Sequence, residues 1–210
     1  MPRLSWSFAI FVATSALCCL AAAPAGAAQA LDGWGAYKFG LTPDAARAVP
    51  GQVFGPYSPK NLMNENRGAM GAKKNAPLFG LPWTLDLLFN SSEKLNEITL
   101  ENEKKSSRDE CEKTFLTVLA QLEKSYGGFA PLNPERKRND TDTPPTSLEW
   151  RAQGASRYQF ATVALEDEYA FVWKARKSAG ANTLDLTASW SGKPEDRAAP
   201  CVANMDYSAR

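Results

Sequence analysis

The clearest pattern in the chain is a run of apolar residues at helical spacing between Ser107 and Tyr126. Apolar side chains recur every three or four residues, which places them on one side of an α-helix about 30 Å long. Ser107 followed by Glu110 fits a capping box at its start, and Gly127 and Gly128 end it. We therefore predict a long helix that lies on an apolar surface. Its apolar stripe consists of Cys111, Phe115, Val118, Leu119, Leu122 and Tyr126.

A second, shorter helix is predicted to begin near residue 42. Thr42 suits the N-cap position, Pro43 the first helical position and Asp44 the first turn. Pro50, followed by a glycine, ends the segment.

Alternation of apolar and polar residues predicts the strands. Residues 81–89 alternate clearly and residues 95–102 return after a polar turn, which indicates a hairpin. Four further strands are predicted at residues 148–152, 157–165, 169–176 and 183–190. Residues 201–207 are expected to form a last edge strand. Residues 52–76 are expected to form a loop with one irregular strand near Val53, and residues 127–146 an exposed excursion.

These elements predict an α+β protein in which an antiparallel sheet, a meander, is covered on one face by one long and one short α-helix. A helix followed by strands occurs twice along the chain. This order leaves open whether residues 31–210 form a single domain or two α-then-β units in tandem, with halves 31–105 and 106–210.

The N-terminal residues have the features of a secretory leader. Arg3 precedes an apolar run over residues 8–23, and residues 28–30 fit the small-x-small cleavage rule. We predict a signal peptide at 1–30 and a bacterial protein that is periplasmic or secreted, with no membrane span after cleavage. The alternatives are a retained N-terminal anchor and a lipid attached at Cys18 or Cys19, although Leu17 before Cys18 does not fit a lipidation site.

Of the four cysteines, Cys111 and Cys201 remain after removal of the leader. Two cysteines in an oxidising compartment predict one disulfide, which would tie the long helix to the C-terminal part of the chain. Closing a loop of roughly 90 residues stabilises a fold by roughly 4 to 5 kcal/mol in the chain-entropy model. A catalytic thiol is the alternative, but the chain has no histidine to activate it.

The charge balance argues against nucleic acid as a partner. The chain has 24 Lys and Arg and 23 Asp and Glu, so loss of Arg3 with the leader leaves a net charge of zero. The absence of histidine removes the commonest general base and most zinc sites. We therefore expect no catalytic residues, metal or cofactor. The carboxylates that keep a glycan hydrolase open as an alternative are Glu97, Glu101, Glu103, Glu149, Glu166 and Glu168.

Residues 39–44, Phe-Gly-Leu-Thr-Pro-Asp, carry a resemblance to known proteins. They look like the opening of many small bacterial periplasmic α+β proteins, in which Phe-Gly precedes Met or Leu, Thr or Ser, and an acidic residue three positions later. The run is similar in style to the SmpA/OmlA-like outer-membrane assembly lipoproteins and to the β-lactamase-inhibitor-protein family. The resemblance implies helices on one face of an antiparallel sheet. It assigns no functional residue.

Aromatic residues supply the remaining functional candidates. Tryptophans fall on four predicted strands at positions 83, 150, 173 and 190, with apolar neighbours two residues away, which favours a core under the helix. The alternative is an aromatic platform on the uncovered sheet face. We expect a non-enzymatic envelope protein that binds another protein through an exposed sheet face. The candidate contact residues are Tyr158, Phe160, Trp34 and Tyr37. Open alternatives are a carboxylate-dependent hydrolase of cell-wall glycan and a carrier of a small apolar ligand between helix and sheet.

Overall fold

The computed structural model describes residues 28–62, 65–132, 159–163, 169–192 and 195–209. In this part of the chain the helices are α1 (Pro43–Arg47) and α2 (Arg108–Tyr126). The strands are β1 (Gly33–Trp34), β2 (Tyr37–Lys38), β3 (Ser58–Leu62), β4 (Glu65–Gly71), β5 (Ala76–Leu78), β6 (Leu81–Phe89), β7 (Leu95–Ser106), β8 (Ala130–Pro131), β9 (Gln159–Val163), β10 (Tyr169–Ala179), β11 (Asn182–Trp190) and β12 (Ala199–Ser208). The predicted leader lies outside the described residues up to position 27.

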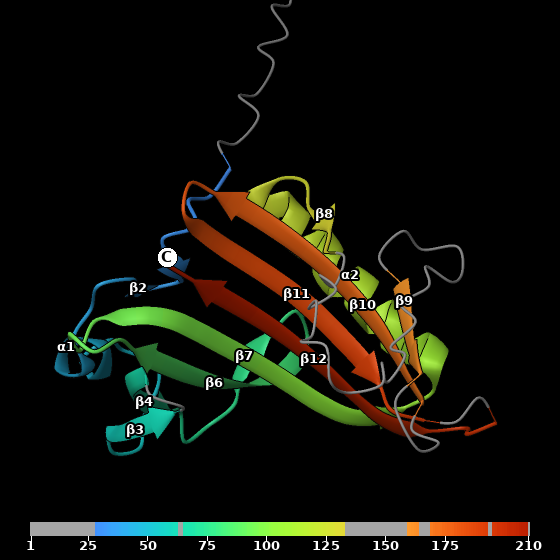
Figure 1. Ribbon diagram of the computed structural model, residues 1–210, viewed down its shortest axis with the longest axis horizontal. Coiled ribbons are helices and arrows are strands. Elements are labelled where there is room, and N and C mark those ends of the chain that lie inside the picture. The colour runs from blue at the N-terminus through green and yellow to red at the C-terminus, as the bar shows by residue number, and fades with distance from the viewer. Residues whose placement is uncertain (1–27, 63–64, 133–158, 164–168, 193–194, 210) are drawn as a thin grey trace, which may run out of the picture.

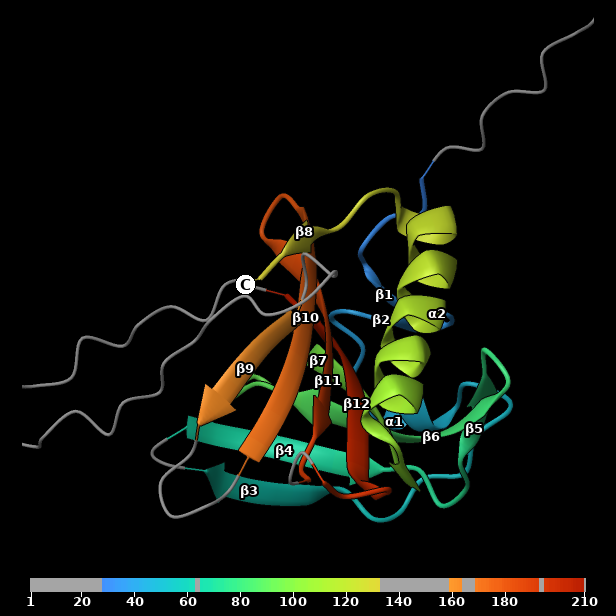
Figure 2. The same cartoon turned by 90° about the vertical axis from the view of Figure 1, so that its right-hand side faces the viewer.

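The described strands form a ten-stranded antiparallel sheet and a separate hairpin of β1 and β2. The sheet has the order β3-β4-β6-β7-β12-β11-β10-β8, with β5 also paired to β6 and β9 to β10. Both helices lie on the same side of this sheet (Figures 1 and 2). The predicted α+β class, with an antiparallel sheet covered on one face by a long and a short helix, is confirmed.

The last strands of the two predicted halves, β7 and β12, pair antiparallel in the middle of the sheet. Strands on one side of this pair follow α1 in the chain, and strands on the other side follow α2. This order is the one that two α-then-β units in tandem would give, and duplication stays a prediction.

The long helix begins where its sequence predicts. The Ser107 hydroxyl accepts a hydrogen bond from the Glu110 amide at 3.3 Å, and the Glu110 carboxylate accepts one from the Ser107 amide at 3.0 Å. These two bonds complete the capping box. Gly127 ends the helix with a φ of 80°, which favours glycine. The predicted apolar stripe is buried against the sheet.

Replacing Ser107 by alanine is expected to lower the free energy of unfolding by about 1 kcal/mol, because the Glu110 amide loses its acceptor and the Glu110 carboxylate loses the hydroxyl that donates to it. The matched control is Ser107→Asp, which keeps a capping oxygen and is expected to stay within a few tenths of a kcal/mol of the parent. Urea unfolding followed by circular dichroism measures both. Equal loss in the two variants would contradict the capping role.

The core lies between α2 and the sheet. Trp83, Trp173 and Trp190 are buried there, so the core interpretation of these tryptophans is confirmed. The Trp190 indole donates a hydrogen bond to the Ser106 carbonyl at 2.8 Å, which satisfies its polar group inside the core. Trp150, with its predicted strand, lies outside the described residues.

The predicted disulfide is present. Cys111 in the first turns of α2 is bonded to Cys201 in β12, with their Cα atoms 5.7 Å apart and a sequence separation of 90. Both side chains are buried. The bond fixes the N-terminal part of α2 onto the middle of the sheet.

Two predictions about the strands are wrong. Residues 201–207 do not form an edge strand, because β12 lies between β7 and β11 in the middle of the sheet. Alternation locates a strand along the chain but not its neighbours, and one neighbour of β12, the strand β7, is distant in sequence. Residues 52–76 are not mainly loop, because they contain β3, β4 and the first residue of β5. Gly68 and Gly71 interrupt the apolar pattern of β4, and the Tyr57 ring occupies the space beside Gly68.

Candidate functional site

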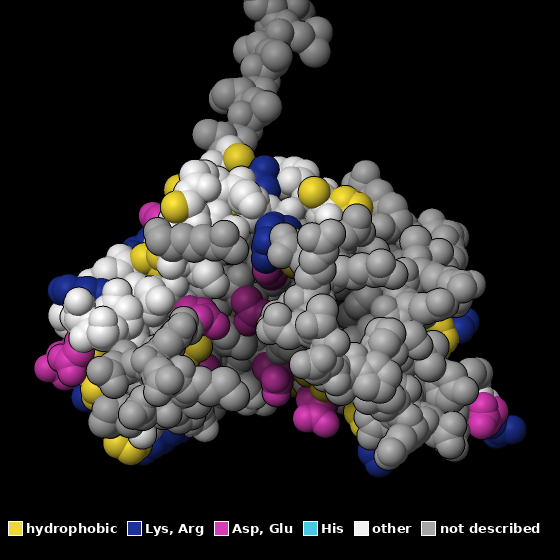
Figure 3. Space-filling view, viewed as in Figure 1, with side chains coloured by type: hydrophobic (Ala, Val, Ile, Leu, Met, Phe, Trp, Pro, Cys, Tyr) yellow, Lys and Arg dark blue, Asp and Glu magenta, His cyan; other side chains and the backbone are white. Residues whose placement is uncertain are grey.

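The candidate site is the face of the sheet that the helices leave uncovered. Figure 1 looks onto this face. In Figure 2 the same face is seen from the side, to the left of the sheet, and β3, β4 and β9 extend further to the left than β12. The face is therefore concave, and the space-filling view shows a hollow near its middle (Figure 3). The name concave face is used below for the outward side chains of β6, β7, β12, β11 and β10.

Strand alternation explains why this face is polar. In β12 the residues Cys201, Ala203, Met205 and Tyr207 are buried on the helix side, and the residues between them point to the other side. The same alternation holds in β6 and β11. The concave face therefore receives mostly polar residues, with a few apolar ones such as Leu88 and Val202 among them.

A row of five side chains crosses the middle of the concave face, one from each strand. Backbone pairing sets Asp86 opposite Thr99, Thr99 opposite Asp206, Asp206 opposite Asp185, and Asp185 opposite Arg176. Directly opposite residues on neighbouring strands have Cβ atoms about 5 Å apart. The row therefore brings three carboxylates, a hydroxyl and a guanidinium together from β6, β7, β12, β11 and β10. This set is called the central row.

The concave face has an excess of negative charge. Its carboxylates are Asp86, Glu97, Glu101, Glu103, Asp185 and Asp206, and its cations are Lys105, Lys174 and Arg176. Six carboxylates against three cations contrast with the zero net charge expected of the mature chain. Acidic side chains gather around the hollow in Figure 3. The face therefore attracts cations, and neighbouring carboxylates are held close together.

One end of the central row is neutralised by an ion pair. The Arg176 guanidinium donates two hydrogen bonds to the Asp185 carboxylate, each at 2.6 Å. The side chains are 32% and 19% exposed, so the pair is partly shielded from water. Such bidentate pairs have fixed geometry. Arg176 therefore holds the Asp185 carboxylate in place beside Asp206.

Asp206, at the centre of the row, lies in a less favourable environment. The pKa of its carboxyl is raised to about 6: burial is the main cause, the nearby Glu97, Asp185 and Glu101 carboxylates add to it, and the hydrogen bond with Thr99 acts against it. Asn204, two residues earlier in β12, has a buried Oδ1 with no hydrogen-bond partner among the described residues. Both groups would gain from a donor or cation placed on this face.

The four aromatic candidates from the sequence do not form one site. Tyr37 is 4% exposed and belongs to the core, and Trp34 stacks on it with ring centroids 6.0 Å apart in the β1–β2 hairpin. Phe160 lies in β9 opposite Val172, and its side chain is outside the described part. Tyr158 also lies outside it. The buried position of Tyr37 removes it from the contact residues expected on an exposed face.

Sequence reasoning missed the central row. The sequence offers Glu97, Glu101 and Glu103 as available carboxylates, and the structure places them on one face of β7. Glu101 and Glu103 are about 7 Å apart along the strand, and Glu97 is about 14 Å from Glu101. Asp185 and Asp206 gave no such signal because they come from two different strands, β11 and β12, whose register is not readable in the sequence. Glu149, Glu166 and Glu168 lie outside the described residues.

Comparisons of the chain with protein-family models, with curated proteins and with solved structures gave no match. Among the described residues, no group of three or more acidic or cysteine side chains is arranged to hold a metal ion. No helix in the described part of the chain is long and apolar enough to cross a membrane. The candidate site therefore rests on the geometry and charge of the concave face alone.

Proposed function

We propose that this chain is an exported, non-enzymatic binding protein of the bacterial envelope whose concave face binds a basic segment of another protein. The observation that carries this proposal is the arrangement of Asp206 directly opposite Asp185 in the middle of the sheet face that the described helices leave uncovered. Like charges opposite each other destabilise a sheet. Arg176 already pairs with Asp185, so a cationic partner would mainly compensate the charge of Asp206, and the arrangement favours binding over a purely structural role.

The shape and extent of the charge support a protein as the partner. The carboxylates come from β6, β7, β11 and β12, an area much larger than one small cation would contact. Lysine and arginine side chains of one basic segment can approach several carboxylates at once, which strengthens binding and speeds association. The leader predicted at residues 1–30 is the basis for placing this function in the periplasm or outside the cell.

The space between α2 and the sheet bears on the alternative of a small-ligand carrier. It is occupied by core side chains that include Phe115, Trp173 and Leu186. Tight packing there favours the concave face as the binding surface.

The proposal predicts that neutralising the glutamates of β7 weakens partner binding at least tenfold. The triple variant removes three charges from the concave face and hardly changes the shape of the side chains; it combines Glu97→Gln, Glu101→Gln and Glu103→Gln. Each interfacial charge pair contributes on the order of 1 kcal/mol to the binding free energy. The experiment recovers and crosslinks partners of tagged residues 31–210 from the native envelope fraction. The affinity of the recovered protein for parent and variant is then measured at two salt concentrations.

The matched control is the triple variant Asp44→Asn, Asp109→Asn and Glu112→Gln, which removes three charges from α1 and α2 on the other side of the sheet. The control should bind like the parent, and parent binding should weaken as salt increases. A recovered partner that binds both triple variants equally, or the absence of any basic partner, would contradict the proposal.

One observation favours the hydrolase as a second candidate. Asp185 is fixed by Arg176, whereas burial raises the pKa of Asp206 to about 6, and catalytic acid–base pairs often have such unequal environments. This candidate predicts turnover of cell-wall glycan that Asp206→Asn abolishes. The binding proposal predicts no turnover by the parent, so an assay of soluble glycan fragments separates the two.

A further inference from the structure

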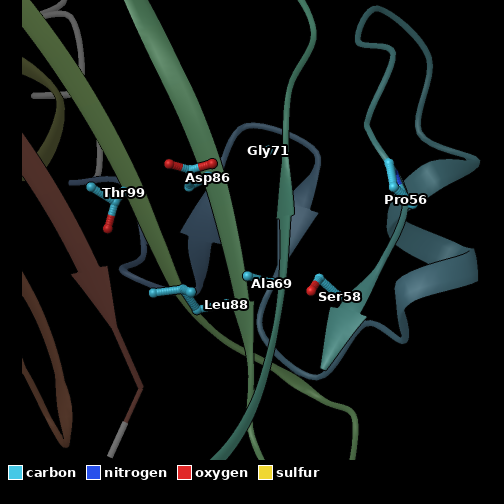
Figure 4. Close-up of a pocket in the computed structure, with 7 residues that line it drawn as sticks. All are labelled: Pro56, Ser58, Ala69, Gly71, Asp86, Leu88 and Thr99. Carbon is cyan, nitrogen blue, oxygen red and sulfur yellow. The ribbon is translucent and has the colours of Figure 1, made fainter. Parts of the chain in front are cut away.

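A pocket opens at one end of the central row, where β3, β4, β6 and β7 meet (Figure 4). Its volume is about 280 Å³, roughly nine times the share of one water molecule in the liquid. This is room for one long side chain. The lining residues are Pro56, Ser58, Ala69, Gly71, Asp86, Leu88 and Thr99. It is called the Asp86 pocket below.

Small residues of β4 make the space. Ala69 lies opposite Leu88, and Gly71 lies opposite Asp86, on the outward side of the sheet. A Cβ atom at Gly71 would come within 2.8 Å of the Asp86 Oδ1 atom, closer than such contacts allow. The carboxylate occupies this position because Gly71 has no side chain.

The lining combines one charge with neutral polar and apolar surface. Asp86 is the single charged residue among the described residues that line the pocket, and Ser58 and Thr99 add hydroxyl oxygens. Leu88 and Pro56 provide apolar surface. A carboxylate with hydroxyl acceptors beside apolar walls suits a long side chain with a hydrocarbon stem and a cationic, donor-rich end.

We propose that the Asp86 pocket binds an arginine side chain of the basic partner, a proposal that rests on the function proposed above. The guanidinium donates to the Asp86 carboxylate and to the hydroxyl oxygens of Ser58 and Thr99, and the stem lies along Leu88. Arginine fits better than lysine because its planar group presents five donors that pair with a carboxylate in a bidentate manner. Thr99 also contacts Asp206, so the pocket is continuous with the central row.

The test uses N-acetyl-arginine amide as the probe on isotopically labelled residues 31–210. Two-dimensional NMR titration is expected to shift the amide signals of the pocket strands, including Gly71, Leu88 and Thr99. The probe should bind at least tenfold more weakly to Asp86→Asn than to the parent. The citrulline analogue, which has the same shape without the charge, should also bind at least tenfold more weakly, and the lysine analogue several-fold more weakly.

Two further variants make the result decisive. Ala69→Val narrows the pocket without removing charge and should also weaken the probe at least tenfold, so the conclusion does not depend on Asp86→Asn folding. Glu112→Gln removes one charge from α2 and should not change probe binding. Equal binding of the arginine and citrulline probes, shifts spread away from the pocket, or unchanged binding to a folded pocket variant would overturn the proposal.

The outcomes separate this proposal from the function on which it rests. In one outcome the native partner binds the parent but not the β7 triple variant, and the arginine probe does not bind in the pocket. This outcome would refute the pocket proposal alone. In the other outcome the arginine probe binds in the pocket, but the affinity for the partner does not change when the β7 glutamates are neutralised. This outcome would refute the proposed role of the wider concave face.

Discussion

Replacing Cys111 and Cys201 together by alanine is expected to lower the free energy of unfolding by about 4 kcal/mol. The bond closes a loop spanning 90 positions, and opening it restores the conformational entropy of that loop to the unfolded chain. Both side chains are buried, so the variant also loses packing between α2 and β12. Typical domains are stable by only about 5 to 15 kcal/mol, so this loss is a large fraction of the total.

Guanidinium unfolding of the oxidised parent and the double alanine variant measures the effect. The control is the parent with its bond reduced, which should match the alanine variant within about 1 kcal/mol because both lack the cross-link. A double variant as stable as the oxidised parent would show that the bond does not stabilise the fold.

Replacing Asp206 by asparagine is expected to raise the free energy of unfolding by about 2 kcal/mol at pH 7. Burial raises the pKa of the Asp206 carboxyl in the folded chain to about 6, from an ordinary value of 3.8. One pKa unit corresponds to about 1.4 kcal/mol, so the full shift would give about 3 kcal/mol. We reduce this total to about 2 kcal/mol because the side chain keeps partial contact with water. Asparagine has a similar shape and avoids the cost of a buried charge.

The effect of Asp206→Asn on the free energy of unfolding depends on pH. Well below pH 3.8 the carboxyl is protonated in both the folded and the unfolded chain, so Asp206 costs nothing there. As pH rises from about 4 to 6 the unfolded chain ionises first, so the parent loses stability relative to the variant. The difference between variant and parent should therefore grow across this range and stay constant above pH 7.

Thermal or urea unfolding between pH 3.5 and pH 8 follows this difference. Asp109→Asn, at an exposed site in the first turn of α2, is the control and should show no such rise. A variant less stable than the parent at pH 7 would mean that ionised Asp206 stabilises the fold. The predicted gain would instead indicate that the sequence keeps a stability cost at this position for binding.

Features that depend on neighbouring residues could be predicted from the sequence. The bounds of α2 follow from Ser107, Glu110 and Gly127, because capping chemistry acts within one turn. The β6–β7 hairpin follows from alternation on both sides of a polar turn. The disulfide could be predicted because two cysteines allow one pairing within the predicted mature chain.

Features that depend on strand pairing could not be predicted from the sequence. The pairing of β12 with β7 joins segments far apart in sequence, and no local pattern specifies it. The central row is a product of that pairing, since Asp185 and Asp206 meet only when β11 and β12 are aligned. Aromatic residues drew attention instead, and Tyr37 shows why this misleads: apolar rings with apolar neighbours indicate core.

The most direct test of the concave face as the binding surface is chemical labelling of carboxyl groups, read by mass spectrometry, in the free chain and in its complex with the recovered basic partner. We predict that labelling of Glu101 and Glu103 on β7 decreases at least several-fold in the complex, whereas labelling of Asp109 and Glu112 on α2 does not change. Protection of the α2 carboxylates with unchanged labelling of β7 would contradict this account and place the partner on the helix side of the sheet.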